Sequence, residues 1–404
     1  MNTDQPLSVQ PLSAKEIDFI QAHLKADIHT LMLQAKRFPE LDMPKLCQQI
    51  LSRQKAKKKL PEWFAHTQLV FPPPLSIEQA SSEATALYKA SLMEGESLLD
   101  ITGGTGIDHY YMSKKFDRST YCEINPEVSS VAHLNFKLLG SSQISVYHGD
   151  FQSYLDLHPE QVDWLYADPA RRGTQKEKVV LLSDCSPDVV ALGSKLKNSA
   201  HQLLIKTSPV LDIAGAVEAL GGIHEVHIIG LGSECKELLF VRFSQAPTFN
   251  YLRKVRLLLP SGKVYAALDF SMDDEKNTIS EFSAPQTFLY EPHAAVMKAG
   301  CYKWIGANFH INKIATSSHL YTSDRLVENF PGRTFRILAV CKPDAKEVKN
   351  IIKTDKANLT IRNFPGSVDD LRKKLRLKEG GKTYLFATTL ENEKKVVIIT
   401  EKIA

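Results

Sequence analysis

Asp100-Ile-Thr-Gly-Gly-Thr-Gly-Ile-Asp108 directly follows the apolar run Ser97-Leu98-Leu99. Gly103, Gly104 and Gly106 predict a tight turn from a strand into a helix, because glycine lets the backbone bend sharply and lie close to a ligand. Such a turn is typical of nucleotide-binding α/β proteins. A glycine-rich turn alone is weak evidence, so its meaning depends on the residues that follow it.

Three carboxylates follow the turn at intervals of about one strand and one helix. Glu123, Asp150 and Asp168 each end a strand-like segment. Open α/β sheets bind their ligands at the carboxyl ends of parallel strands. One carboxylate at such a place is more often a helix cap, but three at successive strand ends indicate a binding site.

The segment from 76 to 245 alternates strand-like and helix-like patterns, which predicts a parallel sheet. The segments 226–230 and 237–243 then predict an antiparallel hairpin across Gly230-Leu231-Gly232-Ser233. Five parallel strands closed by such a hairpin indicate a Rossmann-like class I methyltransferase sheet, whereas a dehydrogenase sheet continues with a sixth parallel strand. The parallel strands are expected around Leu99, Tyr121, Val146, Leu165 and Leu204.

The rest of the chain predicts an N-terminal helical region and two small C-terminal α+β domains. Apolar residues spaced by three and four fill the helical region, and Ser13 with Glu16 predicts a capping box at its start. The last domain is predicted to contain four strands, at 335–340, 359–362, 383–386 and 395–399. The expected boundaries are 1–74 for the helical region, 75–247 for the sheet domain, and 248–330 and 331–404 for the two small domains.

Composition limits the class of protein and its partners. The chain has 404 residues and a formal net charge of +4. From Lys346 onward there are 14 Lys and Arg against 8 Asp and Glu, an excess that suits a phosphate-binding surface or a solvated helix face. The six cysteines include no CxxC pair, which disfavours a metal site and a secreted disulfide framework. With no signal sequence or membrane span apparent, a cytoplasmic protein is expected.

The glycine turn and the first two carboxylates predict a site for S-adenosylmethionine. The turn, opened by Asp100 and Thr102, would hold the methionine half against its backbone N–H groups. Glu123 can accept both ribose hydroxyls, while Asp150 and Phe151 are placed to contact the adenine. NAD is the competing ligand, but no His/Arg pair for hydride transfer is evident.

Asp168-Pro169-Ala170-Arg171-Arg172 predicts the catalytic position. Pro169 stiffens the turn, and the Asp168 carboxylate would accept a hydrogen bond from a target amine and orient its lone pair. Arg171 and Arg172 are suited to hold a substrate phosphate. The alternative is a structural turn with arginines paired to acids. No cysteine follows the fifth strand, so direct transfer to nitrogen or oxygen is favoured over covalent catalysis.

Five motifs together carry a family resemblance: 75–83, 100–108, 168–172, 206–212 and 234–239. With them the chain resembles the bacterial class I S-adenosylmethionine-dependent methyltransferases that have a ferredoxin-like insert and a THUMP-like C-terminal domain, of the Porphyromonas type. The resemblance implies a methyltransferase domain at 75–247, a ferredoxin-like domain at 248–330 and a THUMP-like RNA-binding domain at 331–404. It further implies structured RNA, tRNA or rRNA, as substrate. It also implies that Gln79 closes over the methionine end of the cofactor. Asp-Pro-Ala-Arg replaces the usual Asp-Pro-Pro-aromatic sequence of amino methyltransferases.

The expected activity is therefore direct methyl transfer from S-adenosylmethionine to a base nitrogen of RNA. Two alternatives stay open. One is an RNA-binding protein that keeps the methyltransferase fold as a scaffold only. The other is a methyltransferase with a protein or small-molecule acceptor.

Overall fold

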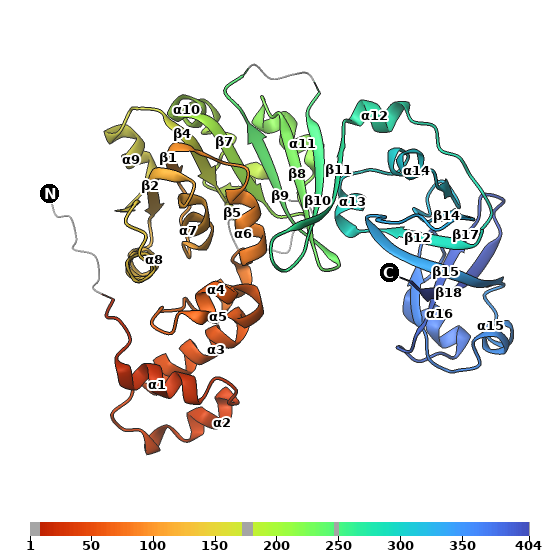
Figure 1. Ribbon diagram of the computed structural model, residues 1–404, viewed down its shortest axis with the longest axis horizontal. Helices are drawn as coiled ribbons and strands as arrows, with labels where there is room; N and C mark the ends of the chain where they lie inside the picture. Colours follow the sequence, from red (N-terminus) through yellow and green to blue (C-terminus); the bar gives the residue numbers. More distant parts are fainter. Residues whose placement is uncertain (1–8, 172–180, 246–249, 404) are drawn as a thin grey trace. The chain divides into compact units, whose positions relative to one another are not determined.

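The computed structural model describes residues 9–171, 181–245 and 250–403. The chain forms two compact units (Figure 1). The first consists of Met1–Glu225, Glu237–Thr248 and Leu258–Lys263, and the second consists of Val226–Lys236, Phe249–Leu257 and Val264–Ala404.

Helices open the first unit, as the apolar periodicity predicts. Ser13 and Glu16 form the expected capping box at the start of α1 (Ala14–Ala22). Leu46 and Ile50 on α3 (Met43–Lys59) are fully buried in the core of this region. The neighbouring helices are α2 (Ile28–Leu33), η1 (Ala35–Arg37), α4 (Pro61–Ala65) and α5 (Pro74–Gln79).

The sheet of the first unit has the predicted class I methyltransferase topology. Its five parallel strands lie in the order β3-β2-β1-β4-β7, and β9 (Glu234–Arg242) pairs antiparallel with β7. The central strands are buried on both faces, and their sequences are accordingly continuous apolar runs. The parallel strands are β1 (Gly95–Asp100), β2 (Phe116–Glu123), β3 (Ile144–His148), β4 (Val162–Ala167) and β7 (Ala200–Thr207).

Helices connect these strands, as a parallel sheet requires. Two short strands and a 3₁₀ turn also follow β4: β5 (Ala170–Arg171), η2 (Leu182–Asp184) and β6 (Cys185–Ser186). The helices are α6 (Glu83–Ala90), α7 (Ile107–Ser113), α8 (Pro126–Leu138), α9 (Phe151–Leu157), α10 (Gly193–Ser199) and α11 (Ile213–Leu220).

The hairpin predicted at 255–268 forms β10 (Leu252–Leu258) and β11 (Val264–Phe270). It turns at Gly262, whose φ of +83° favours glycine. Its first strand, β10, lies next to β8 (Glu225–Leu231), and β8 lies next to β9, as the predicted hairpin requires. This hairpin therefore continues the sheet at the β8 edge, while the domain bounds of 248–330 stay a prediction.

A separate seven-stranded sheet forms the rest of the second unit, in the order β13-β14-β12-β15-β18-β17-β16. Its strands are β12 (Phe288–Pro292), β13 (Asn312–Lys313), β14 (Tyr321–Ser323), β15 (Gly332–Cys341), β16 (Asn358–Ile361), β17 (Thr383–Thr389) and β18 (Lys395–Lys402). Its helices are α12 (Met272–Asn277), α13 (Ala294–Lys298), α14 (Trp304–Phe309), α15 (Ala345–Ile352) and α16 (Val368–Leu375).

The two C-terminal domains predicted from the sequence share this sheet. β12 pairs antiparallel with β15, with Leu289 opposite Phe335. Both side chains are fully buried in one core with Phe386 and Ile398. Cutting the chain before β15 would therefore expose the edge of β12 and half of this core.

Two findings limit the kind of site to look for. Across the described ranges, no helix is long and apolar enough to cross a membrane. The same residues hold no cluster of three His, Cys, Asp or Glu side chains suited to a metal ion. The six cysteines are all free thiols.

Candidate active site

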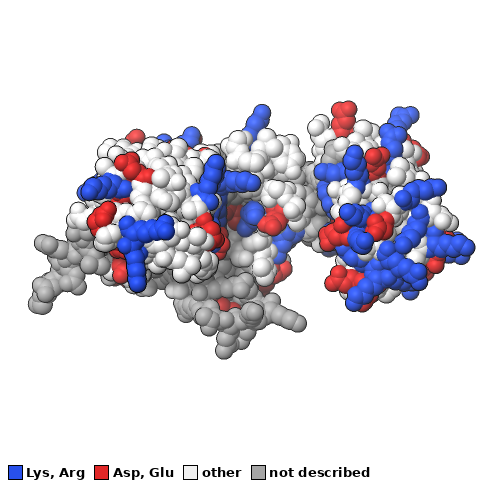
Figure 2. Space-filling view, turned by 90° about the horizontal axis from the view of Figure 1, so that it is seen from below, with Lys and Arg blue, Asp and Glu red and all other residues white. Residues whose placement is uncertain are grey.

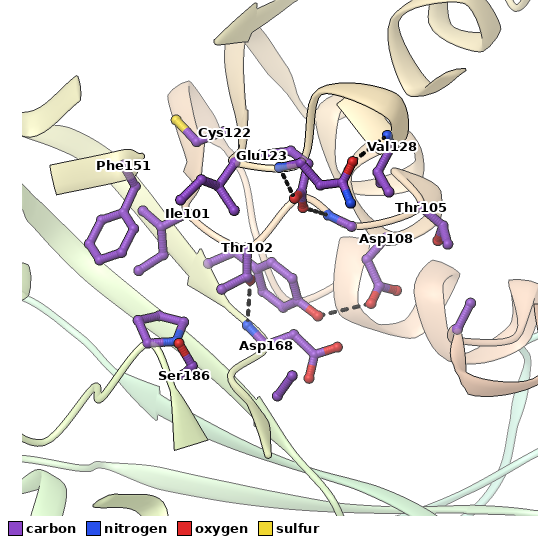
Figure 3. A pocket seen from close by; sticks show the side chains of 18 of the residues that line it. Ile101, Thr102, Thr105, Asp108, Cys122, Glu123, Val128, Phe151, Asp168 and Ser186 are labelled. Carbon is purple, nitrogen blue, oxygen red and sulfur yellow. Dashed lines mark hydrogen bonds between the residues drawn. The ribbon is translucent and has the colours of Figure 1, made fainter. Parts of the chain in front are cut away.

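A cavity of about 610 Å³ lies at the carboxyl ends of β1, β2 and β4, where the sequence predicts the site. Its size falls within the range of small-molecule and cofactor pockets. Figure 3 shows Phe151 and Asp108 toward opposite ends of this cavity. Eight of the predicted residues line it: Gln79, Thr102, Gly103, Gly104, Glu123, Asp150, Phe151 and Asp168.

The glycine turn is fixed by close packing. Gly104 and Gly106 have φ values of +54° and +76°, in the left-handed region that favours glycine. A Cβ on Gly103 would lie 2.2 Å from the ring of Tyr121, and one on Gly106 would lie 2.7 Å from Phe136. The glycines are therefore required for the turn to pack against β2 and α8.

The backbone donors of this turn differ from the expectation that they face the methionine half of a cofactor. The N–H of Gly103 donates to the carbonyl of Cys122 at 2.9 Å, and the N–H of Gly106 donates to the carbonyl of Gly103 at 3.0 Å. The N–H of Gly104 donates to Glu123. The N–H groups of Gly103, Gly104 and Gly106 therefore already have partners within the protein. A ligand would contact this turn mainly by packing against its backbone.

Glu123 ends β2 with its carboxylate held from both sides. Oε2 accepts from the N–H of Gly104 at 2.8 Å, and Oε1 accepts from the N–H of Asn125 at 2.7 Å. A carboxylate has about four acceptor positions, so two remain for a ligand's hydroxyl groups. The glycine turn thus orients this acceptor toward the cavity.

Asp150 and Phe151 stand at the start of α9. Asp150 is the N-cap residue, yet its side chain makes no capping hydrogen bond, so its carboxylate is not committed to the helix. Phe151 is buried, and Ile101 and the exposed Ile124 also line the cavity. This end of the cavity therefore combines a carboxylate that does not cap its helix with apolar walls, which suits a flat heterocycle bearing an amine.

Asp168 lies just after β4 and is tied to two other strands. Its N–H donates to Thr102 Oγ1 at 2.7 Å, and its Oδ2 accepts from the Nζ of Lys206 on β7. Burial alone would lower the pKa of Lys206, but the attraction of Asp168, Asp108 and Glu237 raises it above its ordinary value. Within the described residues, Oδ1 of Asp168 has no partner, so one oxygen remains for a substrate.

Some predicted residues do not line the cavity. Asp100 is 1% exposed and supports the turn by accepting from the N–H of Thr102 at 2.9 Å. Gly106 packs against α8, and Pro169 is buried behind Asp168. Arg171 belongs to β5, but its side chain is outside the described part of the structure, as is Arg172 altogether.

The charge of the cavity is one-sided. Four carboxylates line it, those of Asp108, Glu123, Asp150 and Asp168. Among the described residues, no Lys, Arg or His does so. Such a wall favours ligands that carry amines, hydroxyls or a positive charge over phosphates.

Comparisons with known proteins identify the family of the chain. A crystal structure of a candidate methyltransferase from Porphyromonas gingivalis W83 is 30% identical, covers 98% of this chain and 100% of its own, and has a TM-score of 0.84. Family models match a ferredoxin-like domain at residues 288–331 and a THUMP domain-like region at residues 332–402. The chain belongs to the class I methyltransferase family with these two C-terminal domains.

More distant structures are less similar to this chain. A candidate class I S-adenosylmethionine-dependent methyltransferase from Listeria monocytogenes is 10% identical, covers 62% of this chain and 95% of its own, and has a TM-score of 0.37. An rRNA methylase from Streptococcus thermophilus is 10% identical, covers 39% and 91%, and has a TM-score of 0.29. Scores this low say nothing about substrate. No curated protein sequence matches the chain.

The methyltransferase cavity is backed by charged residues to which the sequence analysis assigns no role. Lys89 on α6 is 0% exposed, and its Nζ lies 3.1 Å from Asp108 Oδ1 and 2.8 Å from Glu237 Oε1. Oδ2 of Asp108 accepts from Ser81 Oγ at 2.7 Å and from Tyr166 Oη at 2.8 Å. We call Lys89, Asp108, Asp168, Lys206 and Glu237 the buried charge cluster.

The pKa values of two acids in the buried charge cluster are shifted in opposite directions. Burial would raise the pKa of Asp108, but the attraction of Lys89 and Lys206 and its hydrogen bonds lower it. Burial raises the pKa of Glu237, because the attraction of Lys89 and Lys206 only partly opposes it. Asp108, which lines the cavity, is therefore the more firmly ionised of the two.

Proposed function

We propose that this protein is an S-adenosylmethionine-dependent methyltransferase that modifies a base nitrogen of structured RNA, tRNA or rRNA, in the cytoplasm. The observation that carries the proposal is the acidic cavity at the carboxyl ends of β1, β2 and β4 in a member of this methyltransferase family. It brings together a glycine turn, three carboxylates at strand ends and an apolar wall. The THUMP-like region supports RNA as the acceptor.

The cavity residues suit S-adenosylmethionine. Glu123 has acceptor positions left for ribose hydroxyls, and Asp150 with Phe151 and Ile124 can receive the adenine. Gln79, at the end of α5, lies on the cavity wall and is proposed to contact the methionine end, together with Asp108. The absence of described cationic side chains on the wall opposes NAD and other ligands with phosphates.

The proposed chemistry is direct transfer, with Asp168 as the catalytic residue. When bound, S-adenosylmethionine supplies an electrophilic methyl group. Lys206 holds Oδ2 of Asp168, and Thr102 holds its backbone N–H, so Oδ1 is presented in a fixed direction. That oxygen would accept a hydrogen bond from the N–H of the target amine and aim the nitrogen lone pair at the methyl carbon. Pro169 and Arg171 are proposed to stiffen the turn and to contact the RNA backbone.

We expect Glu123→Ala and Asp150→Ala each to weaken S-adenosylmethionine binding by about tenfold or more, because each removes hydrogen bonds between a charged acceptor and the ligand. Titration calorimetry gives the dissociation constants. Glu127→Ala is the matched control, since Glu127 is an exposed carboxylate on α8 that does not line the cavity. Unchanged affinity in both cavity variants would show that the pocket has been misassigned.

RNA binding is proposed for the Lys- and Arg-rich surface of the THUMP-like region. Figure 2 shows many Lys and Arg side chains on the C-terminal unit, with Asp and Glu among them. Lys373, Lys374 and Arg376 are exposed at the end of α16, where Asp370 and Asp344 attract Lys373 and Lys374 only weakly. Three exposed cations at one helix end form a local site for a phosphate backbone.

Replacing Lys373, Lys374 and Arg376 together by Gln should weaken RNA binding and its dependence on salt. The slope of log affinity against log salt is expected to become shallower by about 0.7 to 0.9 for each phosphate that the variant no longer neutralises. Binding measured between low and moderate salt checks this. The matched control, Lys15, Lys36 and Arg37 to Gln, removes three exposed charges from the N-terminal helices. An equal change in that control would contradict the assigned surface.

A further inference from the structure

The buried charge cluster carries more carboxylates than ammonium groups. With all three acids ionised, Asp108, Asp168 and Glu237 face Lys89 and Lys206, which leaves one excess negative charge among the described residues of the cluster. Lys206 compensates Asp168, while Lys89 lies between two carboxylates, at 3.1 Å from Asp108 and 2.8 Å from Glu237. Lys206 also attracts Asp108 and Glu237, so the two ammonium groups are shared among three carboxylates.

This excess charge is directed toward the cavity through Asp108. Glu237 is 3% exposed and does not line the cavity, whereas Asp108 does. In Figure 3 the side chains of Asp108 and Asp168 extend into the same part of the cavity, away from Phe151. No described Lys, Arg or His on the wall opposes them. A cation in that part of the cavity would complete the charge balance, and a neutral group would not.

We propose that the buried charge cluster makes the cavity discriminate by charge between S-adenosylmethionine and its product S-adenosylhomocysteine. The inference rests on the proposed function. The two ligands share adenine, ribose and amino acid, but the first carries a sulfonium and the second a neutral thioether. The sulfonium gains the attraction of the excess charge, which is stronger beside the largely buried Asp108 than it would be in bulk water. Loss of the methyl group removes that attraction, so the cluster promotes release of the product.

The test compares dissociation constants of the two ligands for the full-length protein. The wild type should bind S-adenosylmethionine about tenfold more tightly than S-adenosylhomocysteine, as expected for one partly shielded charge nearby. Asp108→Asn and Glu237→Gln each equalise the carboxylates and ammonium groups, so each should bring this ratio close to one. Glu237 does not line the cavity, so Glu237→Gln changes the charge of the cluster without removing a side chain that could touch the ligand.

Lys206→Met should act in the opposite direction, because it leaves three carboxylates against one ammonium group and should raise the ratio. Glu127→Gln, on the exposed side of α8, should leave the ratio unchanged. Thermal unfolding shows whether each variant is folded, and the opposite signs of Glu237→Gln and Lys206→Met test the inference even if Asp108→Asn is unstable.

The outcomes separate this inference from the proposed function. A wild-type ratio near one, or the same ratio in Glu237→Gln and Lys206→Met, overturns the charge discrimination while the methyltransferase assignment stands. Failure of the wild type to bind either ligand overturns both. Sinefungin, in which an ammonium group replaces the sulfonium, should follow S-adenosylmethionine across the variants if charge is the cause.

Discussion

Asp168→Asn is expected to slow methyl transfer to RNA by about a hundredfold or more at saturating S-adenosylmethionine. The amide keeps the size of the side chain but replaces a charged acceptor by a neutral one. Its Nδ2 group would also oppose the ammonium of Lys206, which binds the carboxylate in the wild type. Single-turnover rates at saturating cofactor measure the transfer step apart from any change in cofactor affinity.

S-adenosylhomocysteine binding checks that the Asp168→Asn cavity is intact, because this ligand is neutral at sulfur. Asp156→Asn serves as the matched control. Asp156 lies on α9 and pairs with Lys195 at 2.6 Å, with 71% of its side chain exposed. Transfer by Asp168→Asn at the wild-type rate would contradict a catalytic role for this residue.

Lys89→Met is expected to cost the first unit about 3 to 5 kcal/mol of unfolding free energy. Lys89 is 0% exposed and contacts Asp108, Glu237 and Ser81. Methionine fills similar space but leaves two neighbouring carboxylates buried without a counterion. Chemical denaturation followed by a probe in the first unit measures the loss.

Lys55→Met is the control for this substitution, since Lys55 and Glu78 form an ion pair whose side chains are 32% and 54% exposed. Loss of this ion pair should lower the free energy of unfolding by about 0 to 1 kcal/mol. The double variant Lys89→Met/Glu237→Gln should be more stable than Lys89→Met alone, because it removes one of the two uncompensated carboxylates. Additive losses in the double variant would show that Lys89 is not the counterion of Glu237.

Most of the fold follows from local sequence signals. The strands around Leu99, Tyr121, Val146, Leu165 and Leu204 are apolar and end at polar residues, and all five form the predicted parallel sheet. The sequence also predicts the hairpin at 255–268, but not its place beside β8. Strand pairing between distant segments depends on which apolar faces meet, and one sequence does not reveal this.

The site residues that lie at the carboxyl ends of parallel strands are predictable from the sequence. Glu123, Asp150 and Asp168 meet at one cavity because parallel strands align their carboxyl ends. Asp108, Lys206 and Glu237 lie within the quoted motifs without an assigned role, and Lys89 carries no signal on α6. Their partnership joins α6, α7, β7 and β9, so it exists only after folding. Buried lysines are rare, and only the structure shows that this one is compensated.

Methyl transfer from radiolabelled S-adenosylmethionine to total RNA from cells lacking this protein tests the central claim most directly. Wild-type protein and Asp168→Asn would be assayed side by side, with cellular protein and small-molecule fractions as alternative acceptors. We expect label in RNA with the wild type, recovered in a single methylated base after nuclease digestion, and little with the variant. Label only in protein or small molecules, or no label despite cofactor binding, would contradict an RNA methyltransferase.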